Sequence, residues 1–301
     1  MNNHLSNRPN YIYEPPSEFF TESADLSNLT VFNVLDYGAV ADSSVDNRAA
    51  IQNAVDAAHD AGGGLVYIPT GTYGVAKDPN GSGIINVKDH VFIKGDGVGD
   101  TSLRVIDNSD DAIAGIITSS NTASHVNYGV ADLSLDGNSD NTSGRIDGFL
   151  AGSTTNSNAD QDVAVLRVES MNQSGYGFAD YAKSDRIQME DNIAHDNAWE
   201  GFAVYFVIDG SYENNTAYDN NKHTFDIDNS TDSFLENRTE SNHNDSLIGD
   251  ASDDVFNGGR GDDYINGGAG DDTLKGGGGQ DLLNGDSGDD TLKGYPLHLR
   301  G

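Results

Sequence analysis

The sequence predicts an all-β fold, in which a right-handed parallel β-helix with an N-terminal helical cap is followed by a parallel β-roll. Three observations predict this fold. Short β-rich runs are broken by Asn, Asp and Gly from about residue 84 to 245, two adjacent segments there align with a 23-residue period, and a strict nine-residue register begins at residue 258. Fixed periods of this kind are typical of solenoids, in which each repeat packs on its neighbours.

The region before the repeats predicts the cap. Residues 30–75 contain a strand-like segment, LTVFNVLDYGA, then a short helix around Asn47–His59, and then an apolar strand, GLVYIPTGTY. The helix is expected because apolar residues recur on one face, at Ala50, Ile51, Ala54, Val55 and Ala58. Residues 1–29 are polar and show no periodicity, so we expect an arm or linker there.

The repeated segments predict the coils of the β-helix, which we expect to span 30–245. DNIAHDNAWEGFAVYFVIDGSYE, at 191–213, aligns with NNTAYDNNKHTFDIDNSTDSFLE, at 214–236. A repeat of this length makes one coil of about three short strands, and Asn at equivalent turns tolerates left-handed backbone geometry and can stack between coils. The alternative is an ordinary β-sandwich in which the similarity arises by chance.

The nine-residue register predicts a metal-binding β-roll over 246–293, followed by a tail at 294–301. GGRGDDYIN, GGAGDDTLK, GGGGQDLLN and GDSGDDTLK follow the pattern G-G-x-G-x-D-x-U-x of calcium-binding repeats. The sixth position supplies hard oxygen ligands for Ca²⁺, from Asp254, Asp263, Asp272, Asp281 and Asp290. The eighth position is expected to form a thin core, from Phe256, Ile265, Leu274, Leu283 and Leu292. A flexible Gly/Asp linker is the alternative, but a linker has no reason to keep this register.

Composition limits the possible partners and the cellular location. The formal net charge is −33, and so acidic a chain is a poor partner for nucleic acid, which needs clustered Lys and Arg. The chain has no Cys for disulfides, no recognisable N-terminal signal peptide and no apolar run long enough to span a membrane. Between 246 and 293 there are 11 Asp against three basic residues, a net charge of −8, so most of the negative charge lies before the roll.

Several segments together resemble one family. VFNVLDYGAVADSSVDNRAAIQNAVDAAHDAGGGLVYIPTGTY resembles the cap of pectate-lyase-like β-helices. DLSLDGNSDNTSGRIDGF, SGYGF, IAHDNAWEGF and ENNTAYDNNKHTFDI, joined to the nine-residue repeats, resemble the secreted calcium-dependent mannuronan C-5-epimerases. The resemblance covers about 30–293 and implies an isomerase that converts β-D-mannuronate to α-L-guluronate in alginate. The family's catalytic module usually runs several coils further, so this copy is expected to be shortened.

The resemblance implies a catalytic set of five residues: Tyr176, Tyr181, Arg145, Lys222 and His223. Tyr176 is the family's acid/base tyrosine, Arg145 and Lys222 are cations that neutralise the substrate carboxylate, and His223 and Tyr181 are supporting groups. The family's Asp-Pro-His-Glu is replaced in register by residues 179–182, ADYA, so its His and neighbouring Asp are missing. Asp180 lies one residue late, and neighbours on a strand point to opposite faces, so it is expected to face away from the groove.

Three functions fit this pattern. Epimerisation removes the C5 proton of a uronate and returns one from the opposite face, which requires neutralisation of the carboxylate, a base and an acid. A lyase begins with the same step and then expels the C4 oxygen. An inactive homologue keeps the groove and its cations and binds alginate without altering it. The aromatic residues Trp199, Phe202 and Phe225 are expected to stack within the β-helix rather than to bind sugars.

The resemblance also implies a partner and a place of action. Calcium is the implied cofactor and an anionic polysaccharide, alginate, is the implied substrate; we expect a monomer that acts without nucleic acid or membrane. The nine-residue repeats imply secretion by a type I-like route that needs no N-terminal signal. The short, positively ended tail GYPLHLRG does not look like a complete C-terminal export signal.

Overall fold

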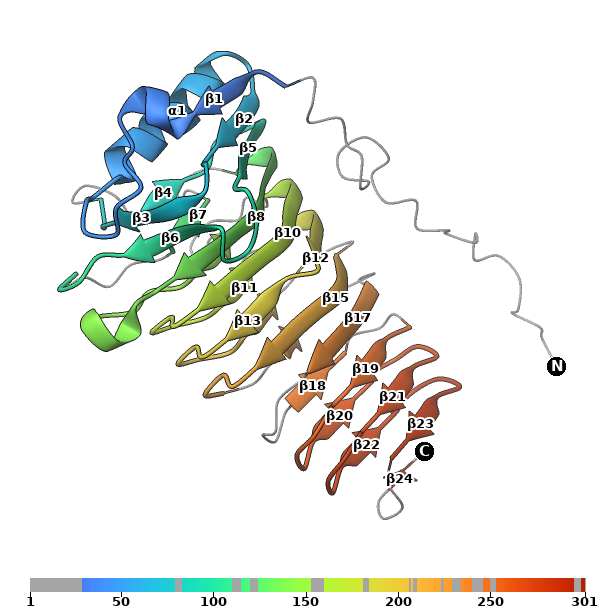
Figure 1. Cartoon of the computed structure of the whole chain (residues 1–301). Coiled ribbons are helices and arrows are strands. Elements are labelled where there is room, and N and C mark those ends of the chain that lie inside the picture. Colours follow the sequence, from blue (N-terminus) through green and yellow to red (C-terminus); the bar gives the residue numbers. More distant parts are fainter. Residues whose placement is uncertain are drawn as a thin grey trace.

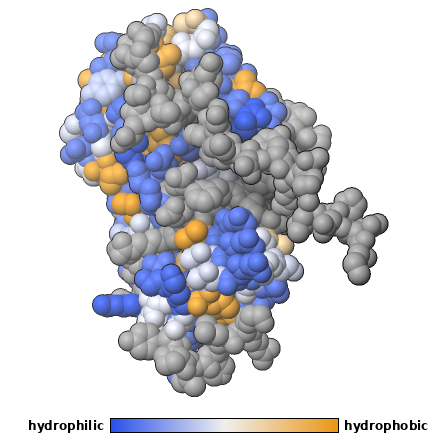
Figure 2. Space-filling view, turned by 90° about the vertical axis from the view of Figure 1, so that its right-hand side faces the viewer, coloured by the Kyte–Doolittle hydropathy of each residue, from blue (hydrophilic) through white to orange (hydrophobic). Residues whose placement is uncertain are grey.

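The chain forms one elongated stack of parallel strands, seen in a computed structural model (Figure 1). The structure describes residues 29–78, 83–109, 115–119, 124–152, 160–180, 184–205, 207, 210–222, 225–228, 234–239, 246–249, 253–294 and 299–300. The helix α1 (Arg48–Asp60) lies at one end of the stack, the coils follow, and the narrower roll lies at the other end. Figure 2 shows one face of the molecule, on which the hydrophobic residues among those coloured form small, separate patches.

Strands succeed one another along the axis, in three sheets in which the described strands pair in parallel. The longest sheet joins β1 (Val31–Asn33), β2 (Gly64–Tyr67), β5 (Val91–Lys94), β8 (Val126–Asp136), β10 (Gln161–Met171), β12 (Asp185–Glu190), β15 (Ser211–Tyr218), β17 (Phe234–Thr239), β19 (Val255–Asn257), β21 (Thr273–Lys275) and β23 (Thr291–Lys293), with β3 (Gly71–Val75), β6 (Thr101–Val105) and β13 (Ile193–His195) beside this path. A second sheet joins β4 (Ile85–Asn86), β7 (Ile117–Thr118), β9 (Phe149–Ala151), β11 (Phe178–Asp180), β14 (Phe202–Tyr205) and β16 (Phe225–Asp228). The third belongs to the roll and joins β18 (Ser246–Ile248), β20 (Tyr264–Asn266), β22 (Leu282–Asn284) and β24 (Leu299–Arg300).

The cap agrees with the prediction in its helix and differs in its strands. Ile51, Ala54, Val55 and Ala58 are buried along one face of α1, as the apolar spacing predicts. The strand expected over LTVFNVLDYGA ends at Asn33, whose side chain accepts the N–H of Leu35 and starts a short 3₁₀ helix, Val34–Tyr37. The strand expected over GLVYIPTGTY is split into β2 and β3, because Pro69 has no N–H for a ladder and Gly71 adopts φ 144°.

The predicted coil period is confirmed in the second half of the solenoid. The register advances by 35 residues from Tyr128 in β8 to Val163 in β10, by 24 from Val163 to Ile187 in β12, and by 23 from Gln188 in β12 to Ser211 in β15. Early coils are thus longer than the repeat, and later coils match it. This explains why the period is visible in the sequence only after about residue 190.

Aromatic rings stack through the core at one position of successive coils. Phe178 and Phe202 lie 4.8 Å apart between ring centroids with an interplanar angle of 11°, and Phe202 and Phe225 lie 4.8 Å apart at 8°. These rings are almost completely buried, as is Phe149 in the register position below Phe178. The prediction that Phe202 and Phe225 stack within the β-helix is confirmed.

Asparagine side chains form the predicted ladders at two corners of the coils. Asn192 donates to the carbonyl of Val165 (2.8 Å) and to Asn215 Oδ1 (2.9 Å), and Asn197 repeats this arrangement with Ser170 and Asn220. The left-handed backbone falls one residue earlier than each ladder residue, for example at Asp191 (φ 54°) and Asn214 (φ 53°). The ladder residues themselves therefore face inward and satisfy buried backbone groups.

The β-roll adds two nine-residue repeats for each turn. Its repeats alternate between the long sheet and the third sheet, and each sheet advances by 18 residues, for example from Val255 to Thr273 and from Tyr264 to Leu282. The predicted eighth-position core is confirmed: Phe256, Ile265, Leu274 and Leu283 are buried and Leu292 packs against them. Since β17 pairs with β19, the coils and the roll share one continuous sheet.

Among the described residues, no helix has both the length and the apolar character that crossing a membrane would require.

Candidate functional site

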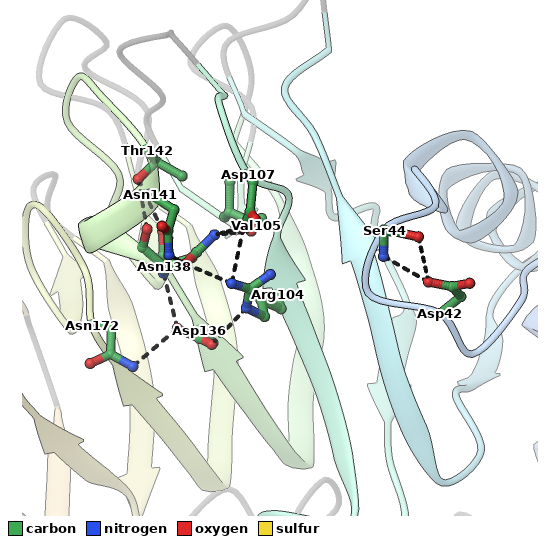
Figure 3. Close-up of polar contacts among 11 residues, drawn as sticks. Asp42, Ser44, Arg104, Val105, Asp107, Asp136, Asn138, Asn141, Thr142 and Asn172 are labelled. Carbon is green, nitrogen blue, oxygen red and sulfur yellow. Dashed lines mark hydrogen bonds and ion pairs between the residues drawn. The ribbon is translucent and has the colours of Figure 1, made fainter.

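A polar network holds the loop that leads into the candidate site (Figure 3). Asp136, at the end of β8, accepts the N–H of Asn138 (2.9 Å) and the side-chain amide of Asn172 from the next coil (3.1 Å). Asn138 adopts a left-handed conformation and accepts a hydrogen bond from Arg104 (2.7 Å), while its own amide donates to Asp107 (2.8 Å). These contacts link three coils and fix the segment that carries Arg145.

The SGYGF segment is tied to this loop by its first two residues. Ser174 Oγ donates to the carbonyl of Gly144 (2.7 Å) and accepts the N–H of Ile146 (2.8 Å). Gly175 is required here, because a β-carbon at this position would overlap Asp147 Oδ1. The backbone N–H of Tyr176 donates to the same oxygen (2.9 Å). The tyrosine is therefore placed by the coil beneath it.

Arg145 and Asp147 form a two-point ion pair beneath Tyr176. Arg145 Nε lies 3.0 Å from Asp147 Oδ1, and Nη2 lies 2.7 Å from Oδ2. The Asp147 side chain is completely buried, whereas that of Arg145 is 37% exposed. Burial raises the pKa of Asp147, and the Arg145 guanidinium and the Tyr176 N–H only partly offset this effect.

The indole of Trp199 contacts Tyr176 and both cations of the site. The Tyr176 ring stands edge-on to it, with centroids 5.0 Å apart at 89°. The guanidinium carbon of Arg145 lies 4.7 Å from the Trp199 ring centroid and Lys222 Nζ lies 4.2 Å from it. Lys222 Nζ is also 3.8 Å from Oε1 of Glu200, which is buried. Two cations, two carboxylates and two aromatic rings thus converge on one place.

The strand after Tyr176 confirms the expected orientation of Asp180. Ala179 packs in the cluster that contains Tyr176 and Trp199, on the side of the candidate site. Asp180 is fully buried and faces the core. The pKa of Tyr128 in the core is raised mainly by the burial of that tyrosine, next by Asp160, and then by the charge of Asp180. The carboxylate next to Ala179 therefore cannot serve the site without a change of backbone register.

Three site residues occupy one position in successive coils. Asp147, Tyr176 and Glu200 each precede a Gly-Phe pair, at 148–149, 177–178 and 201–202. The three phenylalanines are in register, so these residues form a column with Tyr176 between two carboxylates. Asp147 and Glu200 were not predicted as site residues, and Trp199 was expected only to stack within the β-helix. The repeated x-Gly-Phe pattern in the sequence is the signal that could have identified both carboxylates.

The structure brings together three of the five predicted catalytic residues, namely Tyr176, Arg145 and Lys222. Tyr181 and His223 lie outside the described residues. His195, on the long sheet, contacts Asp196 (2.7 Å) and Glu169 (3.3 Å) and stacks on Tyr218.

The sixth-position aspartates of the roll fit a hard divalent cation. A β-carbon on Gly249, Gly258, Gly267, Gly276 or Gly285 would overlap Oδ2 of the aspartate five residues later, so each carboxylate faces bare backbone. Asp281 Oδ2 is buried and has no hydrogen-bond partner within the part of the chain that the structure describes. In that same part no three acidic or histidine side chains converge, so an ion here would also need backbone carbonyls, which are ligands that Ca²⁺ accepts.

Comparison with known proteins agrees with this architecture. Residues 31–252 match the rhamnogalacturonase A/epimerase family, described as pectate lyase-like. The chain belongs to this family. Residues 241–274 and 258–292 match the RTX calcium-binding nonapeptide repeat, so the roll is a calcium-binding RTX module and Ca²⁺ is its ion.

Similar proteins confirm the resemblance to mannuronan C-5-epimerases. Mannuronan C5-epimerase AlgE1 of Azotobacter vinelandii is 44% identical over 206 residues, which are 68% of this chain and 15% of that protein. Alginate lyase 7 of the same organism is 42% identical over 198 residues, 65% of this chain and 23% of that protein. The solved A-module of epimerase AlgE4 superposes with a TM-score of 0.69 at 28% identity and covers 88% of each chain. The chain thus spans well under two thirds of these curated relatives, but most of that module.

Proposed function

We propose that this protein is a mannuronan C-5-epimerase, which converts β-D-mannuronate to α-L-guluronate within alginate. The observation that carries the proposal is the convergence of Tyr176, Arg145 and Lys222 on Trp199, in a chain related to AlgE1. A tyrosine that can transfer a proton and two cations that can hold a uronate carboxylate are the parts that the reaction requires.

The roles follow from the chemistry of the C5 proton. That proton is weakly acidic because the neighbouring carboxylate opposes a carbanion, so a cation must neutralise the carboxylate first. Lys222 is the better placed of the two cations, because its side chain is 46% exposed and its carboxylate contact is long, at 3.8 Å. Tyr176 then exchanges the proton at C5 as base or acid, with Tyr181 and His223 as the supporting groups.

A second candidate is an inactive homologue that binds alginate. It is favoured by one observation: Ala179 stands on the site side of β11 while Asp180 is buried in the core, so no carboxylate reaches the site from this strand. Under this hypothesis the cations of the site are retained without turnover. Relatedness to alginate lyase 7 makes β-elimination a third outcome to be tested.

The setting of the enzyme is part of the proposal. We expect it to act outside the cell as a monomer, exported by a type I-like route, because RTX repeats are typical of exported proteins. The catalytic module is assigned to residues 30–245 and the roll to 246–293. Asp254, Asp263, Asp272, Asp281 and Asp290 are the proposed side-chain ligands for calcium.

The experiment is proton NMR of polymannuronate incubated with the full chain and millimolar calcium, repeated in D₂O. New guluronate signals, with deuterium at C5, are expected. Tyr176→Phe should lower the rate by about 10²- to 10⁴-fold, the usual effect of removing an acid/base group, and leave binding in place. Unsaturated end groups would make the protein a lyase. Binding without any new signal would establish the inactive homologue, and turnover regained with Ala179→Asp combined with Tyr181→His would show that the loss of these two side chains inactivates it.

A further inference from the structure

Trp199 lies between the two cations in the order of the coils. The backbone N–H of Trp199 donates to the carbonyl of Gly175 (3.1 Å), and the backbone N–H of Gly175 donates to the carbonyl of Ile146 (2.8 Å), so Arg145 lies two coils before Trp199. Lys222 belongs to the following coil, where the N–H of Asn221 donates to the carbonyl of Asn197 (2.9 Å). Arg145 therefore lies two coils before Trp199 and Lys222 one coil after it, so the two cations approach one indole from opposite directions along the stack.

The electrostatics of this arrangement favour the indole as the support of the two cations, Arg145 and Lys222. Two like charges within 5 Å of one ring repel each other, and the electron-rich face of Trp attracts both. The indole is also packed, since Tyr176 stands edge-on against it and Leu150, Ala179 and Ala203 form the cluster beneath. An aromatic ring that is already engaged by two cations and a tyrosine is poorly suited to stack on a sugar.

The two cations are held to different degrees. Arg145 gives two hydrogen bonds to the buried Asp147, at 3.0 and 2.7 Å, so its position is fixed without the indole. Lys222 lies 3.8 Å from Glu200, which is beyond a hydrogen bond, but only 4.2 Å from the indole centroid. The ammonium of Lys222 consequently depends on Trp199 for its position much more than the guanidinium of Arg145 does.

We propose that Trp199 is a positioning residue for the carboxylate of an acidic polysaccharide: it acts by holding Lys222, beside the fixed Arg145, and not by stacking on a sugar ring. This inference rests on the proposed function insofar as the ligand is a polyuronate. Lys222 can turn from Glu200 to a substrate carboxylate while it stays over the indole. The indole thus makes up for the flexibility that a lysine has and an arginine fork lacks.

The test is a double-mutant cycle on binding of oligomannuronate to the full chain in calcium, measured by calorimetry at several salt concentrations. Trp199→Leu should weaken binding by about 5- to 20-fold and flatten its salt dependence, because one ionic contact is lost. In a Lys222→Gln background the same change should cost less than about 2-fold. Trp199→Phe, which keeps an aromatic face of lower cation affinity, should lie between wild type and Leu.

The chain offers an internal reporter, because Trp199 is its only tryptophan. Lys222→Gln should shift the fluorescence emission of Trp199 in the absence of ligand and remove most of the change that oligomannuronate induces. Equal costs of Trp199→Leu in both backgrounds, with an unchanged salt slope, would overturn the positioning role and indicate a sugar platform. A wild-type chain that binds oligomannuronate no better than neutral mannan would instead overturn the proposed function itself.

Discussion

The coils and the roll belong to one continuous sheet, yet the polar groups that they bury at their repeated corners differ in charge. In the coils the buried corner groups are neutral amides, and Asn192 and Asn197 find all their partners within the chain. In the roll the buried groups are carboxylates such as Asp263 and Asp272, packed against glycines. The core differs as well, because a roll turn of 18 residues buries about two side chains where a coil buries a phenylalanine stack and several aliphatic residues.

This difference shows where each region obtains its stability. The coils can fold on hydrophobic burial and on hydrogen bonds that neighbouring coils complete without an ion. A roll turn has too thin a core for that, and its buried carboxylates repel one another until a cation joins them. The same sheet is therefore stabilised by packing at one end and by calcium at the other.

Removal of calcium should have the largest effect, and it should destabilise the roll while it leaves the coils folded. With a chelator, the amides of β19, β21 and β23 should lose their protection from hydrogen exchange completely, because metal binding supplies much of the roll's folding free energy. The amides of β10 and β12 should stay protected. Mass-spectrometric hydrogen exchange of the full chain measures both, and equal loss of protection in the two regions would show that the coils depend on calcium as much as the roll does.

Phe202→Ala should then be the most damaging single change in the coils. Its ring stacks between Phe178 and Phe225, so truncation leaves a cavity and should lower the free energy of unfolding by about 3–5 kcal/mol. Urea unfolding in the presence of calcium measures this change. Leu282→Ala is the matched control, because that leucine is 42% exposed in the roll, and its cost should stay within about 0.5 kcal/mol.

Asn192→Ala should have an intermediate effect. It leaves the buried carbonyl of Val165 and the N–H of Val168 without their partner, which costs about 1–3 kcal/mol. The exposed side-chain amide of Asn221 makes a weak 3.4 Å contact with the carbonyl of Ala198, and Asn221→Ala should be nearly neutral. Thermal unfolding of the two variants side by side would refute the ladder's importance if their midpoints coincided.

The smallest effect concerns pH and the ion pair on the sheet of the coils. Burial lowers the pKa of His195, but Glu169 and Asp196 outweigh it, so the pKa is raised. The His195 contact lowers the pKa of Glu169. The pair therefore stabilises the fold most between about pH 4.5 and 6.5, where both groups are charged, and its contribution disappears as pH rises through the pKa of folded His195.

The magnitude should stay below about 1 kcal/mol, as is usual for a partly solvated pair. At pH 5.5 the unfolding midpoint of the wild-type chain should be higher than that of Glu169→Gln. At pH 8.5 the two midpoints should be nearly equal. A difference that grew with pH would contradict this sign. Ser134, which donates to Glu169 (2.7 Å), keeps its partner oxygen in the Gln variant, so the comparison isolates the charge.

The sequence was sufficient to predict the structural features that recur in every repeat. It was insufficient to predict the side-chain contacts between residues of different repeats. The 23-residue and nine-residue periods predicted the coils, the ladders and the inward leucines, because each of these depends on one position in a regular unit. The inward turn of Asp180 also followed from strand alternation alone. The break at Pro69 was missed because a single apolar run concealed it.

The site was harder to predict, since its contacts join several coils. Arg145, Trp199 and Lys222 come from different levels of the stack, and two of those levels are separated by coils of unequal length. No local pattern shows that the two cations share one indole or that Glu200 stands beneath one of them. Family resemblance identified the cations, and the packing revealed what holds them.

The pairing of β17 with β19 has a consequence for aggregation of the chain before the roll has folded. A parallel stack that stops presents a bare row of N–H and C=O groups, which is a template for other chains. The first turn of the roll covers that row, and this turn is the part that calcium must assemble. We therefore expect calcium to suppress aggregation. Where the ion is scarce, the last coil keeps an unpaired sheet edge, and where it is plentiful, the folded roll covers that edge.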